Sequence, residues 1–258
     1  MILGAGIPVT RFAKHTPPRI GYQSLFDDAT LTGDGTDIDN AFDWLTWDVW
    51  ESDVRGGTIT ATLDEGQTAN YFGVAGQDAY LVAGVITLQY YDYTTGSWTE
   101  AASIAPGDTH VYMATFDTVG SDRWRIVTTS ATAFNVGVFA AGMYLELDRG
   151  CYGGFAPPRM AQTPDLLTNG SQSGALLGRS VVRSGFKGTF TLSHLRHQWV
   201  HNNMRTWLDV AQTRGWFLQW DPDGYPNEAA YAWTLSEPVV SNQSARYMQT
   251  TVQIEGIE

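Results

Sequence analysis

The chain has 258 residues, 43% of them hydrophobic, which allows one large all-β domain or two ordinary ones with proper cores. Its formal net charge is −12, and phosphate binding needs a basic face, so the composition argues against a nucleic-acid partner. The same charge disfavours an anionic membrane surface, and no stretch approaches the ~20 apolar residues that a membrane span needs.

Two further features bear on the cellular compartment. Cys151 is the only cysteine, so an internal disulfide cannot form. The opening residues MILGAGIPVTRF have no basic n-region and too short an apolar run for a signal peptide. We therefore expect a soluble, acidic protein without a secretory leader and without membrane insertion.

The first part of the chain alternates as β-strands do. In GTITATLD (57–64), Ile59, Ala61 and Leu63 fall on one face and threonines on the other. Many short strands without an amphipathic helix are typical of a β-sandwich or jelly roll. Further strands are predicted at 80–91, 110–116, 123–130 and 134–147, with turns at 94–97, 106–108 and 119–122.

The charge distribution marks a boundary near residue 150. Residues 1–150 hold nineteen acidic residues and seven Lys or Arg, whereas residues 151–258 hold eight of each. The segment RGCYGGFAPPRMAQTPDLLTNGSQSG is rich in Gly, Pro, Ser and Asn, which is typical of a connector. The predicted division is an N-terminal strand or arm at 1–24, a β-sandwich at 25–148, a connector at 149–174 and a second β domain at 175–258.

The second unit mixes strands with one helix. GFKGTFTLSH (185–194) alternates as a strand does, and five apolar residues between Val200 and Ala211 form one stripe at helical spacing. The helix is predicted over 198–214, because Gly215 is a C-terminal stop. Strands at 216–220, 230–240 and 246–257 complete a small β-barrel or sheet with one flanking α-helix.

Four segments of the first unit carry a family resemblance. They are DWLTWDVW (43–50), GGTITATLDEGQTANYFGVAGQDA (56–79), VITLQYYDYTTGSWTEA (85–101) and DRWRIVTTSATAFNVGVFAAGMYLEL (122–147). Over about residues 25–148 the chain resembles the galactose-binding-like jelly roll, or discoidin-type fold. This resemblance implies a β-sandwich, but it gives architecture more firmly than activity, because the fold hosts many functions.

A second resemblance is carried by the segments from GRSVVRSGFKGTFTLSH through YMQTTVQIEGI and by the W-x-P-D-x-x-P-x-E-like turn from Trp220 to Glu228. These segments resemble the ring-forming domain of phage tail-tube and distal tail proteins, and the turn also occurs in similar virion proteins. This resemblance implies a small β-barrel with one helix that assembles side by side into a hexameric ring. Distal tail proteins place the ring domain first, whereas here the jelly roll comes first or follows an initial strand such as residues 2–10.

The acidic stretch TGDGTDIDN (32–40) is a candidate cation site. Asp34, Asp37, Asp39 and Asn40 offer the hard oxygen ligands that Ca²⁺ prefers, and galactose-binding-like domains often carry a structural Ca²⁺ near an early loop. The spacing is not that of an EF-hand. We favour the alternative, a solvated turn with Asx-type hydrogen bonds and no cofactor.

Three tryptophans follow this stretch at intervals of three residues. Aromatic stripes fill cores more often than they bind ligands, and a buried Trp removes a large apolar area from water. We therefore expect Trp44, Trp47 and Trp50 to pack in the core of the first unit.

The hairpin YYDYTTGSW (90–98) is the best candidate for a carbohydrate or protein contact. Tyr91 and Tyr93 share one strand face, Trp98 returns beside them, and Asp92 adds a hydrogen-bonding group. A sugar site needs an exposed aromatic plane with hydrogen-bonding side chains around it. The alternative is that these side chains pack only as cross-strand pairs.

Arginines of the second unit are candidates for contacts between copies of the chain. In a ring, the predicted helix and these arginines would meet acidic surfaces of the next subunit, and the charge asymmetry would orient the contact. The candidates are Arg179, Arg183, Arg196 and Arg205.

Two other motifs have simpler explanations. His194, His197 and His201 are suitably spaced for one helix face, but no fourth metal ligand is evident, so we favour surface histidines. The segment DPDGYPNE (221–228) is explained by turn chemistry, although it could also touch a neighbouring subunit.

No enzymatic motif is present. The sequence lacks a G-x-S-x-G elbow, a Walker loop and an H-E-x-x-H helix, while a carboxylate pair for glycoside cleavage has no fixed spacing and stays open. We therefore predict that the chain is not an enzyme.

The main functional prediction is a virion structural protein of a phage tail tip, of the distal tail or baseplate type, made in the host cytoplasm. Its partners would be copies of itself in a ring, other tail proteins and, through the jelly roll, a host surface glycan. The alternative is a stand-alone carbohydrate-binding module without ring assembly. A glycosidase-like enzyme has the least support.

Overall fold

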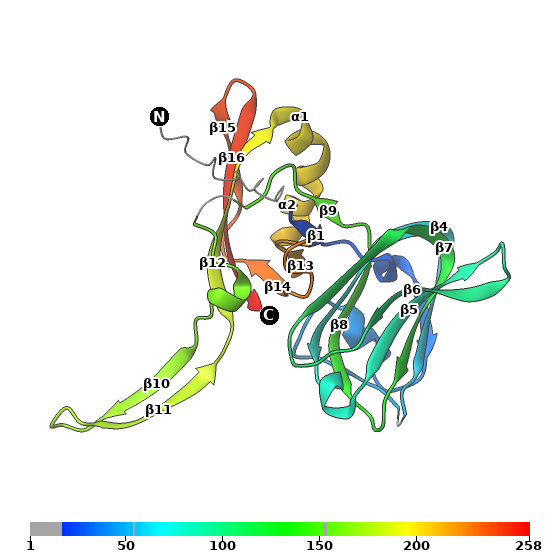
Figure 1. The fold of residues 1–258 in the computed structure, drawn as a ribbon, viewed down its shortest axis with the longest axis horizontal. Helices are drawn as coiled ribbons and strands as arrows, with labels where there is room; N and C mark the ends of the chain where they lie inside the picture. The colour runs from blue at the N-terminus through cyan, green and yellow to red at the C-terminus, as the bar shows by residue number, and fades with distance from the viewer. Residues whose placement is uncertain (1–16, 54, 152–153) are drawn as a thin grey trace, which may run out of the picture.

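The computed structural model describes residues 17–53, 55–151 and 154–258 of the chain. The protein is mainly β, as the sequence predicts, with 53% of its residues in strands. The strands form two seven-stranded sheets and one separate two-stranded hairpin (Figure 1). The predicted initial strand at 2–10 lies outside the described residues.

The first sheet builds the jelly-roll unit. Its strand order is β3-β8-β4-β7-β5-β6, and β2 pairs with β4. Ile59, Ala61 and Leu63 point into its core, as their alternation predicts. The strands are β2 (Thr30–Gly33), β3 (Trp50–Glu51), β4 (Thr58–Gln77), β5 (Val85–Asp92), β6 (Ser97–Ile104), β7 (Tyr112–Thr129) and β8 (Asn135–Gly142), with short 3-10 helices η1 (Leu25–Asp28), η2 (Ile38–Phe42) and η3 (Ala79–Val82).

The strand boundaries of this unit differ from the prediction in two places. The predicted turn at 119–122 is wrong, because β7 runs unbroken through it and pairs Gly120 and Ser121 with β4. The β4–β7 ladder has register shifts on both sides of this segment, so the residues that indicated a turn lie in an irregular part of the strand pairing. The predicted strand 80–91 begins later, at Val85, because residues 79–82 form a 3-10 turn closed by the Gly84 N–H on the Ala79 carbonyl.

The second unit is built on the other sheet, in the order β12-β16-β14-β13-β1-β9, with β15 paired to β16. Strands β1 and β9 flank the jelly roll in the sequence and pair with each other, so the chain enters and leaves the jelly roll side by side. The strands are β1 (Arg19–Gly21), β9 (Leu145–Glu146), β12 (Phe186–Arg196), β13 (Trp216–Gln219), β14 (Ala229–Thr234), β15 (Val239–Ser244) and β16 (Tyr247–Ile257).

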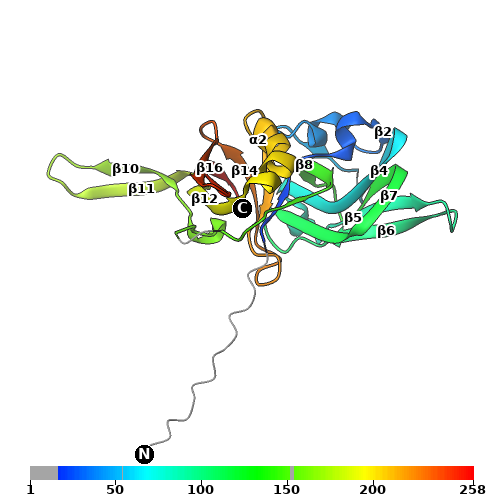
Figure 2. The same ribbon diagram turned by 90° about the horizontal axis from the view of Figure 1, so that it is seen from above.

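One helical segment covers this second sheet (Figure 2). It consists of α1 (His197–Trp199), a π-helical turn at Val200–Met204 and α2 (Arg205–Ala211). The predicted apolar stripe faces the core, where the Trp207 ring meets the Trp216 ring edge-on at 5.3 Å. Among the described residues, no helix has the length and apolar character to cross a bilayer.

A two-stranded hairpin begins in the predicted connector, at 149–174, and ends in the predicted second domain. It consists of β10 (Asp165–Gly170) and β11 (Leu176–Arg183), which pair only with each other. Figures 1 and 2 show it projecting away from both sheets. A short 3-10 turn, η4 (Pro158–Met160), precedes it.

The two units share an apolar interface. Tyr71 and Val138 from the jelly roll pack with Phe217, Ala229 and Tyr231 from the second sheet, and all five are buried. This contact buries the face of the jelly roll that adjoins the second unit.

The acidic opening of the jelly roll is only partly buried. Trp44 and Trp50 lie in apolar clusters, but Trp47 is 76% exposed. The prediction that all three tryptophans pack in the core is therefore wrong for Trp47. The Trp44 and Trp50 indole N–H groups donate to the Asp27 carboxylate and the Asp34 carbonyl, and this pairing allows both rings to be buried.

Candidate functional site

The aromatic residues predicted at the hairpin tip come together on the outer face of β5, β6 and β7. Tyr91 pairs directly with Trp98 across the β5–β6 ladder, so both side chains stand on the same face. The intervening residue Tyr90 points the other way, where its ring packs on buried Trp124 at 5.9 Å. Alternation along β5 thus separates a core face from an aromatic outer face, which we call the aromatic face.

The rings of the aromatic face meet edge to face. Tyr91 lies 5.0 Å from Tyr93 and 5.5 Å from Trp98 between ring centroids, at interplanar angles of 76° and 78°. This T-shaped geometry is the favourable one for aromatic pairs and holds the rings in place before any ligand arrives. Tyr93 is 61% exposed, so the outermost ring remains in solvent.

Two arginines from β7 flank the rings. The Arg123 guanidinium lies over Tyr91 at 5.6 Å, and that of Arg125 lies over Trp98 at 4.4 Å. The Arg125 Nε–H also donates to Gln89 Oε1 at 2.7 Å. Partial burial lowers the pKa of Arg125. These arginines were not among the predicted contact residues, although the Arg-Trp-Arg alternation at 123–125 places both on one face.

Acidic groups complete the rim of this face. The Tyr93 hydroxyl donates to Asp122 Oδ1 at 2.7 Å, and this bond raises the pKa of Tyr93 because it stabilises the protonated phenol. Asp92 holds the hairpin turn, and its predicted role as a contact residue stays a prediction. Its carboxylate accepts from the Thr94 N–H at 2.8 Å and from the Thr95 hydroxyl, and these bonds lower its pKa.

Two of the four predicted calcium ligands, Asp34 and Asn40, take part in structural hydrogen bonds through their side chains. Asp34 Oδ2 accepts from the Thr58 N–H at 3.0 Å, and the Asn40 amide donates to Asp48 Oδ1 at 2.9 Å. Asp37 adopts a left-handed conformation, with φ of 54°, just before η2. Asp39 lies within η2. The described residues contain no group of three or more His, Cys, Asp or Glu placed to hold a metal ion, and the calcium site stays a prediction.

The predicted interface arginines are spread over three elements. Arg196 ends β12, where its guanidinium and backbone N–H bind the Asp148 carboxylate, which is almost fully buried. Arg205 is exposed on α2 and Arg179 on β11. Arg183 is also in β11, but its side chain lies outside what the structure describes. Arg196 is thus already paired within the chain, and the interface role of the set stays a prediction.

The remaining motifs have local partners. The rings of His197 and His201 lie 4.7 Å apart on the helical segment, tilted by 38°, whereas His194 belongs to β12. In the turn 221–228, Trp220 Nε1 donates to Glu228 Oε2 at 2.8 Å and its ring stacks on Tyr225 at 5.2 Å. The spacing from Trp220 to Glu228 therefore closes the turn on itself.

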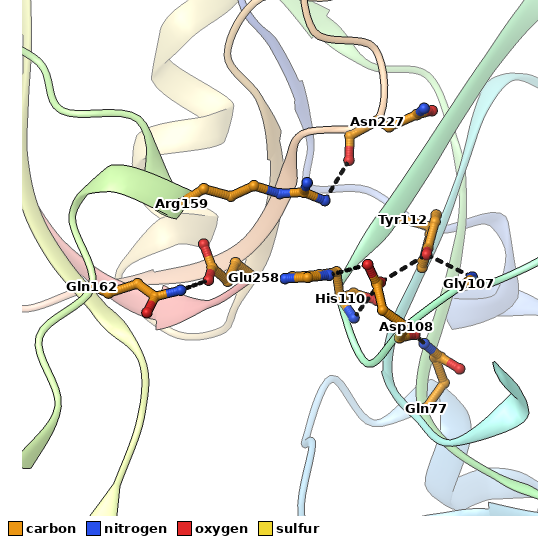
Figure 3. Close-up of polar contacts among 9 residues, drawn as sticks. All are labelled: Gln77, Gly107, Asp108, His110, Tyr112, Arg159, Gln162, Asn227 and Glu258. Carbon is orange, nitrogen blue, oxygen red and sulfur yellow. Dashed lines mark hydrogen bonds and ion pairs between the residues drawn. The ribbon is translucent and has the colours of Figure 1, made fainter. Parts of the chain in front are cut away.

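A polar cleft between the two units was not predicted (Figure 3). A cavity of about 450 Å³ is bounded by Asp108 and Tyr112 of the jelly roll and by Arg159 and Asn227 of the second unit. The only signal in the sequence is the polar segment PGDTHVY (106–112), which reads as an ordinary turn. Its partners on the second unit are about fifty and over one hundred residues away, so sequence spacing could not reveal the site.

Comparison with known proteins gives a similarity of limited extent. No family model and no curated protein matches the chain. A pectin binding carbohydrate binding module is similar at 14% identity over 46% of this chain and 91% of its own, with a TM-score of 0.37.

Two other solved modules are similar to the same degree. The family 32 carbohydrate-binding module from Streptococcus pneumoniae EndoD has 16% identity over 47% of this chain and 99% of its own, with a TM-score of 0.39. A module from Clostridium perfringens, in complex with GalNAc-β-1,3-galactose, has 10% identity over 46% of this chain and 99% of its own, also with a TM-score of 0.39. At such low identities and TM-scores, these similarities carry no argument about what this chain does.

Proposed function

We propose that the chain is a carbohydrate-binding protein that contacts glycans through the aromatic face of its jelly roll. The observation that carries the proposal is the grouping of Tyr91, Tyr93 and Trp98 on one outer sheet face. A sugar ring has an apolar C–H face and a polar rim. It therefore suits a surface on which aromatic rings stand beside hydrogen-bonding groups.

The groups around the rings match the polar rim of a sugar. Gln89, Arg123 and Asp122 lie on or beside the same face and together offer donors and acceptors for hydroxyl groups. The rings are already fixed by mutual packing and by the arginines, so little side-chain conformational freedom would be lost on binding. We infer binding without catalysis, because no motif for a reaction accompanies this face.

The test is a glycan array followed by calorimetric titration of the best glycan. We expect Trp98→Ala and Tyr91→Ala each to weaken binding about tenfold or more, because each removes a ring from the contact. Trp47→Ala is the matched control, since Trp47 is an exposed tryptophan of the same unit outside this face. Glycan binding that survives in both Trp98→Ala and Tyr91→Ala, or that is lost in Trp47→Ala instead, would refute the proposed location.

A second candidate function is that of a structural subunit of a phage tail tip. It would assemble with copies of itself, in a ring, and with other tail proteins in the virion. The observation that favours it is the projecting β10–β11 hairpin, because exposed apolar patches mark interaction surfaces. The hairpin exposes Leu166, Leu167, Leu176, Leu177 and Val181.

An isolated two-stranded hairpin is marginally stable in water, so a partner that covers it would stabilise it. This candidate function therefore predicts self-association that depends on the hairpin. The two candidate functions are compatible if the assembled protein presents its aromatic face to host glycans.

A further inference from the structure

The cleft between the two units has walls of different chemistry. The wall of the jelly roll presents Asp108 and Tyr112, and the wall of the second unit presents Arg159 and Asn227. Figure 3 shows Arg159 reaching from η4 toward the side that carries Asp108 and Tyr112. A smaller neighbouring cavity, of about 340 Å³, opens beside His110.

Arg159 lacks the partners that a partly buried guanidinium usually has. Its Nε is buried and has no hydrogen-bond partner among the described residues. Its only described hydrogen bond is a long one, from Nη2 to the Asn227 carbonyl at 3.4 Å. Buried polar atoms are nearly always paired with protein, water or ligand, so this side chain has donors available for a bound group.

The opposite wall carries a fixed negative charge. Asp108 Oδ1 accepts from the Tyr112 hydroxyl at 2.8 Å and from the His110 N–H at 3.0 Å, while Oδ2 lies 2.5 Å from His110 Nδ1. Burial alone would raise the pKa of Asp108, but these hydrogen bonds outweigh it and hold the pKa below its ordinary value. The carboxylate therefore stays ionised near neutral pH.

Arg159 and Asp108 face the same cavity but are not joined to each other. No ion pair links them in the part of the chain that the structure describes. A ligand between them would meet a guanidinium fork on one side and hydrogen-bond acceptors on the other. A carboxylate suits the fork because it can accept two parallel N–H bonds.

We propose that this cleft is a binding site for a small sugar acid, whose carboxylate is bound by Arg159 and whose hydroxyls donate to Asp108. The cavity of about 450 Å³ lies within the size range of small-molecule sites and accommodates a monosaccharide or disaccharide. The site is separate from the aromatic face and does not depend on the function proposed for that face.

The ligand would contact both units at once. A group that binds only the folded protein raises its melting temperature by mass action. Because this site lies at the interface between the units, ligand binding requires both units to be folded and in contact. Thermal stability is therefore a direct readout of binding, beside the affinity itself.

The experiment uses the full chain with D-galacturonate and D-galactose, which differ only in the carboxylate at C6. We expect galacturonate, titrated by calorimetry and by thermal shift, to bind and to raise the melting temperature, and galactose to do neither. Arg159→Gln should weaken galacturonate binding about tenfold, the effect of losing a charge-assisted hydrogen bond. Arg159→Lys, which keeps the charge and loses the fork, should give an intermediate affinity.

Controls keep the result interpretable. Arg246→Gln removes an exposed arginine outside the cleft and should leave binding unchanged. Each variant is compared with the parent by circular dichroism and melting temperature without ligand, so that misfolding is recognised, and Arg159→Lys replaces any variant that misfolds. Equal binding of the two sugars, no binding of either, or unchanged galacturonate affinity in Arg159→Gln would each overturn the proposal.

Discussion

Gly73 shows how a missing side chain brings the two units together. A Cβ atom at this position would lie 2.8 Å from the ring of Phe217, which is fully buried in the interface. The neighbouring backbone and ring therefore pack more closely than any other residue type would allow. Gly21 has the same relation to the ring of Tyr71.

We expect Gly73→Ala to destabilise the protein by about 1–3 kcal/mol, the usual cost of forcing an extra methyl group into a packed interior. Chemical denaturation measures the change. Gly188→Ala is the control, because nothing lies within 4 Å of its Cβ position and its free energy of unfolding should change little. An equal effect of the two substitutions would show that the close approach at Phe217 is not what matters.

The Asp148–Arg196 pair makes stability depend on pH. Burial alone would raise the pKa of Asp148, but the hydrogen bonds from Arg196 outweigh it and lower the pKa in the folded state. A lowered folded pKa means that the pair contributes stability above the unfolded value of about 4, and that this contribution disappears as pH falls through the folded pKa. The effect is therefore present at neutral pH and absent in strong acid.

Asp148→Asn should accordingly destabilise the protein at pH 7, and the difference from the parent should shrink as the pH is lowered below about 4. Urea denaturation at several pH values measures both free energies. Asp209→Asn removes an exposed carboxylate of the helical segment and should give a small difference without this pH dependence. A destabilisation by Asp148→Asn that stays constant down to strong acid would contradict the ion-pair explanation.

Among the strands, β4 shows where alternation predicts a strand face and where it does not. The alternation at 57–64 predicted one face of β4, but β4 continues to Gln77 through the segment GQTANYFGVAGQ. In that continuation Phe72 and Val74 face the jelly-roll core, while Tyr71 and Ala75 face the second unit. A strand buried on both faces loses the period-two signal, so its length could not be predicted from alternation.

The aromatic face could be predicted only in part. Tyr91, Tyr93 and Trp98 lie on one hairpin, so local spacing was enough to bring them together. Arg123 and Arg125 belong to β7, and only the pairing of β5 with β7 places them beside the rings. Contacts within a hairpin follow from sequence spacing, whereas contacts with a third strand depend on sheet order.

The β10–β11 hairpin carries a prediction about assembly. If it is an interaction arm, the mass of the protein in solution should rise with concentration, because burying its exposed leucines removes apolar area from water. Replacing residues 166–182 by a short Gly-Ser turn should abolish that rise and leave the fold intact, since the hairpin pairs with neither sheet. Light scattering after size exclusion measures the mass.

The control for the hairpin is a matched change elsewhere on the surface. Val239→Ser removes an exposed aliphatic residue of β15 and should leave self-association unchanged. A strict monomer at all concentrations, or association that survives removal of the hairpin, would count against its role as an interaction arm.

At the scale of the whole molecule, the two units contact each other in two ways, by apolar packing and by polar contacts. The buried cluster around Phe217 and Tyr231 joins them through apolar packing. Arg214 of the second unit adds a polar contact by donating to the Asp27 carboxylate of the jelly roll at 2.9 Å. The predicted charge boundary near residue 150 gave no indication that the two units share an apolar interface.

The organisation suggests a division of roles. The aromatic face lies on β5, β6 and β7, while the projecting hairpin extends from the second unit in another direction (Figure 1). A surface that binds glycans and a surface that binds copies of the chain would then not compete. The cleft between the units is a third surface, with its own ligand chemistry.

Glycan contact at the aromatic face can be tested by NMR of the tryptophan indole N–H groups. The signal of Trp98 is assigned with a Trp98→Phe variant, and the best glycan from the array is then titrated into the full chain. We expect the Trp98 signal to shift progressively while the exposed Trp47 signal stays in place. A glycan that binds and leaves Trp98 unchanged, or an array on which no glycan binds, would contradict the proposed contact.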